Sequence, residues 1–228
     1  QAMMGTAILQ IIVSDEERVP DYTDHNTEDP TVPTEPTDPT EPSEPTKPTE
    51  PVKPETPVFN DIQAGSWYEA SVAYMVDSGL MNGVGKGKFN PTGNVTRAML
   101  VTILYRAAGS PSVAGMNNPF KDVPQSWYTD AVIWAANKDV VNGVKPDRFN
   151  PDGNITREQI ATILYRYEGS PDTAETLPPF ADSGDISSYA LKPMNWAIDN
   201  GLINGTGGGK LSPRNTATRA QIKIVKPE

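Results

Sequence analysis

The chain has 228 residues, a formal net charge of −10, no Cys and a single His, His25. The absence of Cys excludes disulfides, Cys-based zinc sites and cysteine nucleophiles, and a single His leaves little scope for imidazole chemistry. Residues 1–57 carry 13 acidic and 3 basic side chains, whereas residues 58–228 carry 16 of each. The C-terminal part therefore lacks the basic face that binds nucleic acid, and we expect no nucleic-acid partner, no cofactor and no metal site.

The N-terminal segment contains an apolar run from Thr6 to Val13. The run is too short to span a bilayer, so we expect no membrane insertion, and its Ile, Leu and Val content favours a buried strand. Residues 1–10 lack the basic start and cleavage site of a signal peptide. We interpret residues 1–25 as the remnant of an upstream domain, which would be an effector domain of a longer protein. A leader with chance hydrophobicity is the alternative.

A proline-rich segment follows at residues 26–57, with Pro at every third position from Pro30 to Pro57. This period matches the turn of a polyproline II helix, and the segment would reach on the order of 85 Å if fully extended. Acidic residues between the prolines repel one another and keep the chain open. We therefore predict an extended spacer, with a ligand for proline-binding domains as the competing interpretation.

The first unit after the spacer predicts two helices joined by an irregular loop. The first helix has its small and apolar residues at helical spacing and ends at a glycine: Ala70, Ala73, Tyr74 and Gly79. The loop from Asn82 to Gly93 holds four Gly and one Pro, which excludes regular structure. The second helix begins at Thr96 and places apolar side chains on one face: Leu100, Ile103 and Leu104.

This unit recurs three times with a period of about sixty residues. Each copy opens with Phe-x-Asp and closes with Thr-Arg, and an Asn-Gly pair lies 14 residues before each Thr. We place the repeats at residues 58–117, 118–177 and 178–228, the third being short at its C-terminus. Fixed spacing indicates one supersecondary unit copied three times, so we predict a mostly α protein of three tandem helix-loop-helix repeats.

The Thr that begins each second helix suits the N-cap position, where its hydroxyl accepts an otherwise unpaired backbone N–H. A Gln three residues later completes a capping box in repeats 2 and 3, but in repeat 1 Met99 takes that position. The Arg after each Thr is less favourable, since the helix dipole disfavours a cation there. Such an Arg can bind a carboxylate or phosphate, or it can form an ion pair within the chain; the sequence leaves both open.

These linked motifs resemble the S-layer homology (SLH) module. The resemblance rests on Phe-x-Asp, Trp67-Tyr68 or Trp127-Tyr128, Asn-Gly, Phe-Asn-Pro and Thr-Arg in register, over about three quarters of the chain. It implies a pseudo-threefold helical domain with grooves between neighbouring repeats. It further implies a secreted bacterial protein that binds a secondary cell wall polymer in those grooves, commonly through pyruvylated N-acetylmannosamine, and performs no chemistry.

The resemblance also assigns expected roles to residues. Three Arg would pair with a ligand carboxylate: Arg97, Arg157 and Arg219. Three Asp would accept bonds from sugar hydroxyls or brace the Arg: Asp61, Asp122 and Asp182. Three aromatic residues would offer an apolar face to a sugar, with core packing as the alternative for the two Trp: Trp67, Trp127 and, by counting back from Trp196, Tyr189. Three Gly would let the backbone approach the ligand or would supply a positive φ: Gly83, Gly143 and Gly205.

Two departures from the family pattern predict that the three grooves differ. Repeat 2 has Lys145-Pro146-Asp147 where the other loops are rich in Gly. Repeat 3 ends its second helix after barely two turns, before Pro227, and we expect a loosely packed unit with a weak Arg219 site.

Other functions are less well represented in the sequence. Asn150, Asp152 and Asn154 resemble alternate ligands of a calcium loop, but Ile155 stands where that loop needs Gly, so we predict a turn. Repeated carboxylates in equivalent triplicate do not indicate the pair that a glycosidase requires, so we predict no enzyme activity. The rival to a glycan-binding anchor is a protein-interaction or self-assembly module.

Overall fold

The computed structural model describes residues 10–13, 59–176 and 178–225. All of these residues belong to one of the two units into which the chain divides. The predicted spacer at 26–57, and residues 1–25 apart from 10–13, lie outside the described residues, so the predictions for them remain predictions. None of the described helices is long and apolar enough to cross a membrane.

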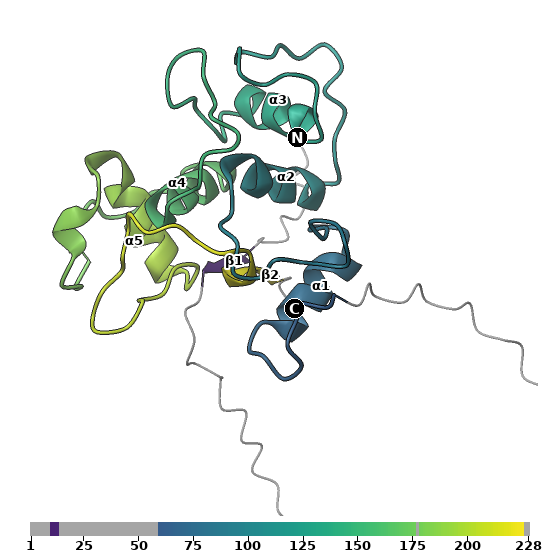
Figure 1. The fold of residues 1–228 in the computed structure, drawn as a ribbon. Coiled ribbons are helices and arrows are strands. Elements are labelled where there is room, and N and C mark those ends of the chain that lie inside the picture. The colour runs from purple at the N-terminus through teal and green to yellow at the C-terminus, as the bar shows by residue number, and fades with distance from the viewer. Residues whose placement is uncertain (1–9, 14–58, 177, 226–228) are drawn as a thin grey trace, which may run out of the picture. The chain divides into compact units, whose positions relative to one another are not determined.

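The described part is mostly helical, and each repeat has the predicted first helix (Figure 1). Repeats 1 and 2 each contain two α-helices: α1 Glu69–Asp77, α2 Arg97–Ala107, α3 Thr129–Asn137 and α4 Arg157–Tyr167. Repeat 3 contains one α-helix and three single 3₁₀ turns: α5 Leu191–Asp199, η1 Ser183–Asp185, η2 Ser188–Ala190 and η3 Arg219–Gln221. Two short strands complete the elements: β1 Gln10–Val13 and β2 Ile222–Val225.

The N-caps of the second helices agree with the prediction. The Thr96 hydroxyl accepts the Met99 N–H at 3.2 Å, without a returning side chain. Thr156 with Gln159 and Thr218 with Gln221 each form a capping box. Each Thr-Arg pair therefore fixes the start of the element after it.

The prediction of a short second helix in repeat 3 is wrong. After the single turn η3, the chain continues as β2, which pairs antiparallel with β1 in the register Gln10 to Val225 and Val13 to Ile222. The sequence from Ile222 contains three β-branched residues in four, which fit a strand better than a helix. The strand predicted within residues 6–13 is present at β1, and its partner is the C-terminal strand.

The repeats pack in a closed order, in which the end of each repeat contacts the first helix of the next. Helix α2 packs on α3, α4 packs on α5, and β2 packs on α1 (Figure 1). The apolar faces of the second helices form the core through residues such as Leu100, Leu104, Ile160 and Leu164. Because β2 takes the place of a third second helix, repeat 3 still closes the pseudo-threefold arrangement.

A cyclic set of backbone hydrogen bonds lies at the meeting point of the three repeats. Val95 N–H donates to Ala217 O at 2.9 Å, Ile155 N–H donates to Val95 O at 3.0 Å, and Ala217 N–H donates to Ile155 O at 3.4 Å. Each of these residues precedes the Thr-Arg pair of its repeat. The three Thr-Arg pairs are thereby arranged around one common centre.

Candidate functional site

The three Arg side chains lie at the joints between repeats and are only 2–7% exposed. In each joint, Nε and Nη2 donate to two backbone carbonyls in the loop of the following repeat. The acceptors are Phe149 O and Asn142 O for Arg97, Leu211 O and Asn204 O for Arg157, and Phe89 O and Asn82 O for Arg219. The Nε distances are 2.8 Å in all three joints. The Arg residues therefore hold neighbouring repeats together, a role that the sequence did not indicate.

The three Asp side chains organise the same loops from the other side. Each carboxylate accepts two consecutive backbone N–H groups at 2.8 Å: Asp61 from Phe89 and Asn90, Asp122 from Phe149 and Asn150, and Asp182 from Leu211 and Ser212. Within the described residues, no ion pair joins Arg97 or Arg219 to these carboxylates; Asp122 pairs instead with Arg148 at 3.7 Å. The Asp residues brace the Arg indirectly, because one loop residue binds both.

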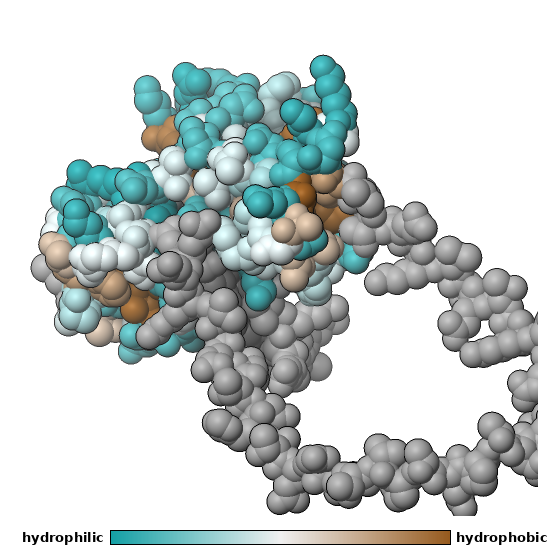
Figure 2. All heavy atoms as spheres, turned by 60° about the horizontal axis from the view of Figure 1, so that its bottom comes forward, coloured by the Kyte–Doolittle hydropathy of each residue, from teal (hydrophilic) through white to brown (hydrophobic). Residues whose placement is uncertain are grey.

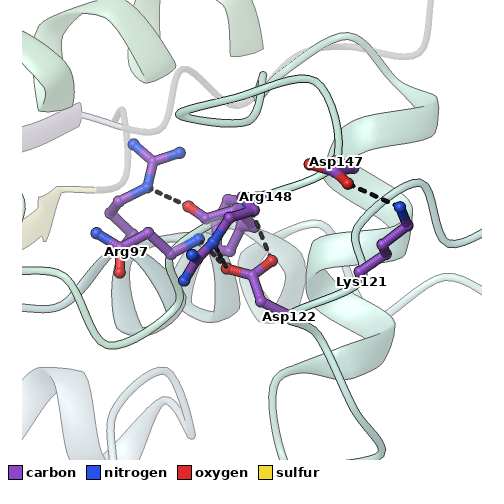
Figure 3. Close-up of polar contacts among 7 residues, drawn as sticks. Arg97, Lys121, Asp122, Asp147 and Arg148 are labelled. Atoms are coloured by element: carbon purple, nitrogen blue, oxygen red, sulfur yellow. Dashed lines mark hydrogen bonds and ion pairs between the residues drawn. The ribbon is translucent and has the colours of Figure 1, made fainter.

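Figure 3 shows this arrangement in repeat 2. We call the Asp carboxylate, with the two loop N–H groups that it accepts, the clamp of each repeat. Arg97 reaches the loop through Phe149 O, while Asp122 lies on the opposite side of the same segment. Lys121 and Asp147 form an exposed ion pair of 2.9 Å at the edge of the loop. The Lys145-Pro146-Asp147 segment thus leaves the clamp intact.

The pKa values of these groups depend on their surroundings. Burial alone would raise the pKa of the Asp61, Asp122 and Asp182 carboxyls, but the backbone N–H donors outweigh it and lower each pKa below its usual value. Burial lowers the pKa of Arg97 and Arg219, and the charges of Asp122 and Asp61, respectively, oppose this effect. The carboxylates are consequently ionised at neutral pH.

The three predicted Gly residues have an ordinary negative φ, so the positive-φ interpretation is wrong. At Gly83 and Gly143 the absence of a side chain permits a close approach instead, and at Gly205 a side chain would make a tight contact. A Cβ at Gly83 would lie 2.5 Å from the Phe59 ring and 2.8 Å from Lys88 O, and one at Gly205 would lie 3.2 Å from the Phe180 ring. Gly143 is similarly confined by Phe120 at 2.8 Å. The Phe that opens each repeat occupies the space that a side chain at the Gly position would need.

The three predicted aromatic residues are exposed, in contrast to the core-packing alternative. Trp67 is 40% exposed, Trp127 59% and Tyr189 52%. Trp67 and Trp127 each pack edge-on against the following Tyr, with ring centroids 5.3 and 5.1 Å apart. Part of each ring is thus accessible from solvent, and Tyr189 occupies the corresponding place just before α5.

One pocket of about 330 Å³ brings several of these features together, and we call it the first site. Residues from all three repeats line it: Leu80, Met81, Asn82, Gly83, Val84, Met99, Thr102, Ile103, Arg106, Trp127 and Arg219. The lining contains two cations, Arg106 and Arg219, and no acidic residue. Arg106 Nη1 also donates to Leu80 O at 3.2 Å, which fixes its position. Arg219 is held by the same two carbonyl bonds as the other Arg residues and lines this pocket, while the expectation of a weak Arg219 site stays a prediction.

The repeat positions that form the first site correspond to Arg97, Arg166 and Tyr189 one repeat further on, and we call this place between repeats 2 and 3 the second site. The charges of Asp122 and Arg166 act on Arg97, which places both groups near it, and Tyr189 interacts electrostatically with Arg97 as well. Glu158, at the start of α4, accepts the Tyr189 phenol at 3.2 Å. By the same correspondence, Arg157 and Trp67 mark the third site, for which β2 stands in place of a second helix. The chain therefore differs around the three Arg residues, and the prediction that the three grooves bind differently stays a prediction.

No group of His, Cys, Asp or Glu in the described residues could hold a metal ion. Asn150 to Asn154 form a turn in which the Gly153 N–H donates to Asn150 O at 3.1 Å. The visible face in Figure 2 is largely hydrophilic or neutral, with apolar residues in small separate areas.

Comparison with known proteins agrees with the repeat structure. The sequence model of the S-layer homology domain matches residues 58–98, 119–161 and 179–222, together more than half of the chain. The chain therefore belongs to the S-layer homology family, as the resemblance of its motifs implied.

Similar proteins include surface-layer proteins and enzymes. The chain is 32% identical to the Surface-layer 125 kDa protein of Lysinibacillus sphaericus over 174 residues, or 73% of this chain and 14% of that protein. It is 30% identical to S-layer protein EA1 of Bacillus anthracis over 165 residues, or 72% and 19%. An Endoglucanase of Bacillus sp. (strain KSM-635) is 29% identical over 171 residues, or 73% and 18%. The chain thus spans less than a fifth of the length of these relatives.

Proposed function

We propose that this domain attaches the protein to a bacterial cell surface by binding a carboxylate-bearing glycan, a pyruvylated secondary cell wall polymer, at the sites between its repeats. Family membership and the surface-layer relatives support attachment at the cell surface. The observation that carries the glycan proposal is the first site, where two Arg and no acidic residue surround an apolar pocket beside the exposed Trp127.

The composition of the first site suits such a ligand. A carboxylate needs charge-assisted hydrogen bonds from a guanidinium, and a sugar ring or a ketal methyl group needs an apolar surface. Arg106 and Arg219 offer the first, and Met99, Ile103 and Trp127 offer the second. We also propose that the domain is not catalytic. The same part of this chain is similar to a surface-layer protein and to an endoglucanase, which suits a segment that attaches different proteins to one surface.

The test is sedimentation of the purified chain with bacterial wall sacculi, before and after chemical removal of the secondary polymer. We expect pelleting only with untreated walls. Pelleting with both preparations would point to peptidoglycan instead, and pelleting with neither would favour the rival protein-interaction module. Soluble wall polymer should displace a glycan-binding domain and leave a protein-binding one in place.

Two variants locate the binding at the first site. Trp127→Ala removes an exposed ring, and Arg106→Gln removes one charge together with the bond to Leu80 O. Each should weaken wall binding by roughly tenfold or more, with an unchanged circular dichroism spectrum. Trp67→Ala, the matched change at the third site, should have a smaller effect. Equal effects of the two Trp changes would contradict the assignment to the first site.

A further inference from the structure

A buried carboxylate distinguishes the second site from the other two. Glu158 is 5% exposed and follows Arg157 in the first turn of α4. The positions after Arg97 and Arg219 are Ala98 and Ala220, both buried and uncharged. Burying a carboxylate is costly unless hydrogen bonds compensate, so its presence in only one of the three repeats points to a specific task.

Glu158 is held by groups of repeat 3. Its Oε2 accepts the Ser187 N–H at 2.9 Å, and its Oε1 accepts the Ser187 hydroxyl at 2.9 Å and the Tyr189 phenol at 3.2 Å. The N-terminal end of α4 also favours a negative charge. The carboxylate is therefore fixed in place, and it fixes the ring of Tyr189 with it.

Besides burial, the hydrogen bond to Glu158 raises the pKa of Tyr189, the aromatic residue of the second site, and it fixes the direction of the phenol. Burial and the Glu158 carboxylate raise the pKa of Tyr189 to about 12, while Ser187 and Arg97 act in the opposite direction. The phenol remains protonated and directed at Glu158, although the side chain is half exposed. Trp127, its counterpart in the first site, has no carboxylate among the residues that line its pocket.

The charges of the two sites otherwise correspond closely. Arg97 and Arg166 in the second site match Arg219 and Arg106 in the first, by their positions in the repeat. Asp122 acts on Arg97 as Asp61 acts on Arg219. An electrostatic difference at the aromatic residue itself is the negative charge of Glu158, which accepts the Tyr189 phenol.

We propose that Glu158 makes the second site select an uncharged sugar unit, so that the carboxylate-bearing unit of the glycan binds at the first site. This inference rests on the proposed function. A buried negative charge disfavours an incoming anion without affecting a neutral sugar, and the locked Tyr189 provides a face for the neutral ring. Glu158 acts through Tyr189 and through its field, and is therefore a positioning residue.

The test compares two sugars, pyruvylated N-acetylmannosamine and N-acetylmannosamine, by NMR titration of the whole chain. In the Trp127→Ala background, which weakens the first site, we expect the preference for the pyruvylated sugar to be lost. Adding Glu158→Gln, which keeps the size of the side chain, should shift the affinity ratio toward the pyruvylated sugar by roughly three- to tenfold. Asp199→Asn removes an equal charge from an exposed position at the end of α5 and should leave the ratio unchanged.

Each result has a distinct meaning. A ratio that Glu158→Gln does not change, in a variant with an unchanged melting temperature, overturns the inference and leaves the proposed function intact. If the Glu158→Gln variant melts at a lower temperature, Tyr189→Phe supplies the second measurement, because this change removes only the phenol bond. Tyr189→Phe should lower the affinity for the neutral sugar. An unchanged affinity also overturns the inference. Failure of the unaltered chain to bind either sugar rejects the proposed function, and this inference with it.

Discussion

Repeats 1 and 2 differ from repeat 3 in the element that comes after the Thr-Arg pair. In the first two, the chain continues as the helices α2 and α4; in the third, it makes the single turn η3 and becomes the strand β2. The bonds of the Arg are nevertheless the same, with Nε and Nη2 on two loop carbonyls of the neighbouring repeat. The joint is therefore made by the Thr-Arg pair and the facing loop, and it does not require a helix after it.

The largest expected effect is the loss of one joint. Arg157→Ala and Arg219→Ala each leave two carbonyls without their guanidinium donor, and each should lower the free energy of unfolding by about 3 kcal/mol. Urea unfolding measured by circular dichroism gives the loss. Arg148→Ala, which removes an exposed side chain from a long ion pair with Asp122, is the control and should cost under about 0.5 kcal/mol. A much smaller cost for Arg219→Ala than for Arg157→Ala would show that the strand does weaken the third joint.

A smaller effect concerns the Asp clamps and acid. The pKa of each clamp carboxyl is lower in the folded protein than its ordinary value of 3.8. Each carboxylate therefore stabilises the folded protein at a pH above 3.8, and this stabilisation is lost as the pH falls through the pKa of the folded protein. The melting temperature should therefore fall as the pH drops below about 4.

Substitution of the clamps compares repeat 3 with repeat 1 directly. Asp182→Asn and Asp61→Asn should each cost about 1–2 kcal/mol at pH 7 and should flatten the acid dependence. Asp185→Asn, an exposed neighbour in η1, should do neither. Unequal losses for the two clamp variants would show that the loops of repeats 1 and 3 are not held alike.

The smallest effect concerns the one second helix without a capping box. Met99→Gln should supply the side-chain bond that Gln159 and Gln221 make, and should raise the unfolding free energy by about 0.5 kcal/mol. Met99→Leu retains an apolar side chain without the bond and should not stabilise the helix. Since Met99 also lines the first site, a stabilised Met99→Gln variant that binds walls more weakly would separate the two roles.

Much of the local structure could be predicted from the sequence. Helical spacing, the Thr caps and the glycine that ends the first helix are all interactions between residues close in the chain, and they placed α1 to α4 correctly. The family motifs also drew attention to Trp67 and Trp127, for which core packing had been the alternative; both are exposed. The helix predicted after Thr218 was wrong because the β-branched residues there form the strand β2, which pairs with β1 near the other end of the chain.

The candidate site was harder to predict because its bonds are long-range. Arg219 reaches Asn82 across 137 residues, and nothing near either residue indicates the contact. The sequence pattern correctly indicated an Arg poorly placed for its helix, but only charged partners were expected for it, and its bonds to carbonyls were missed. Glu158 was also overlooked, although an acidic residue where the other repeats have Ala was a visible signal.

The cyclic hydrogen bonds among Val95, Ile155 and Ala217 also limit how many copies the domain can contain. Stacked arrays grow by adding units at an end, because each unit contacts only its neighbours. Here every unit gives one bond and receives one, so the circle is complete with three members. A chain with repeats 1 and 2 alone would leave Val95 N–H and Ile155 O unmatched, and a fourth repeat would find both ends already taken.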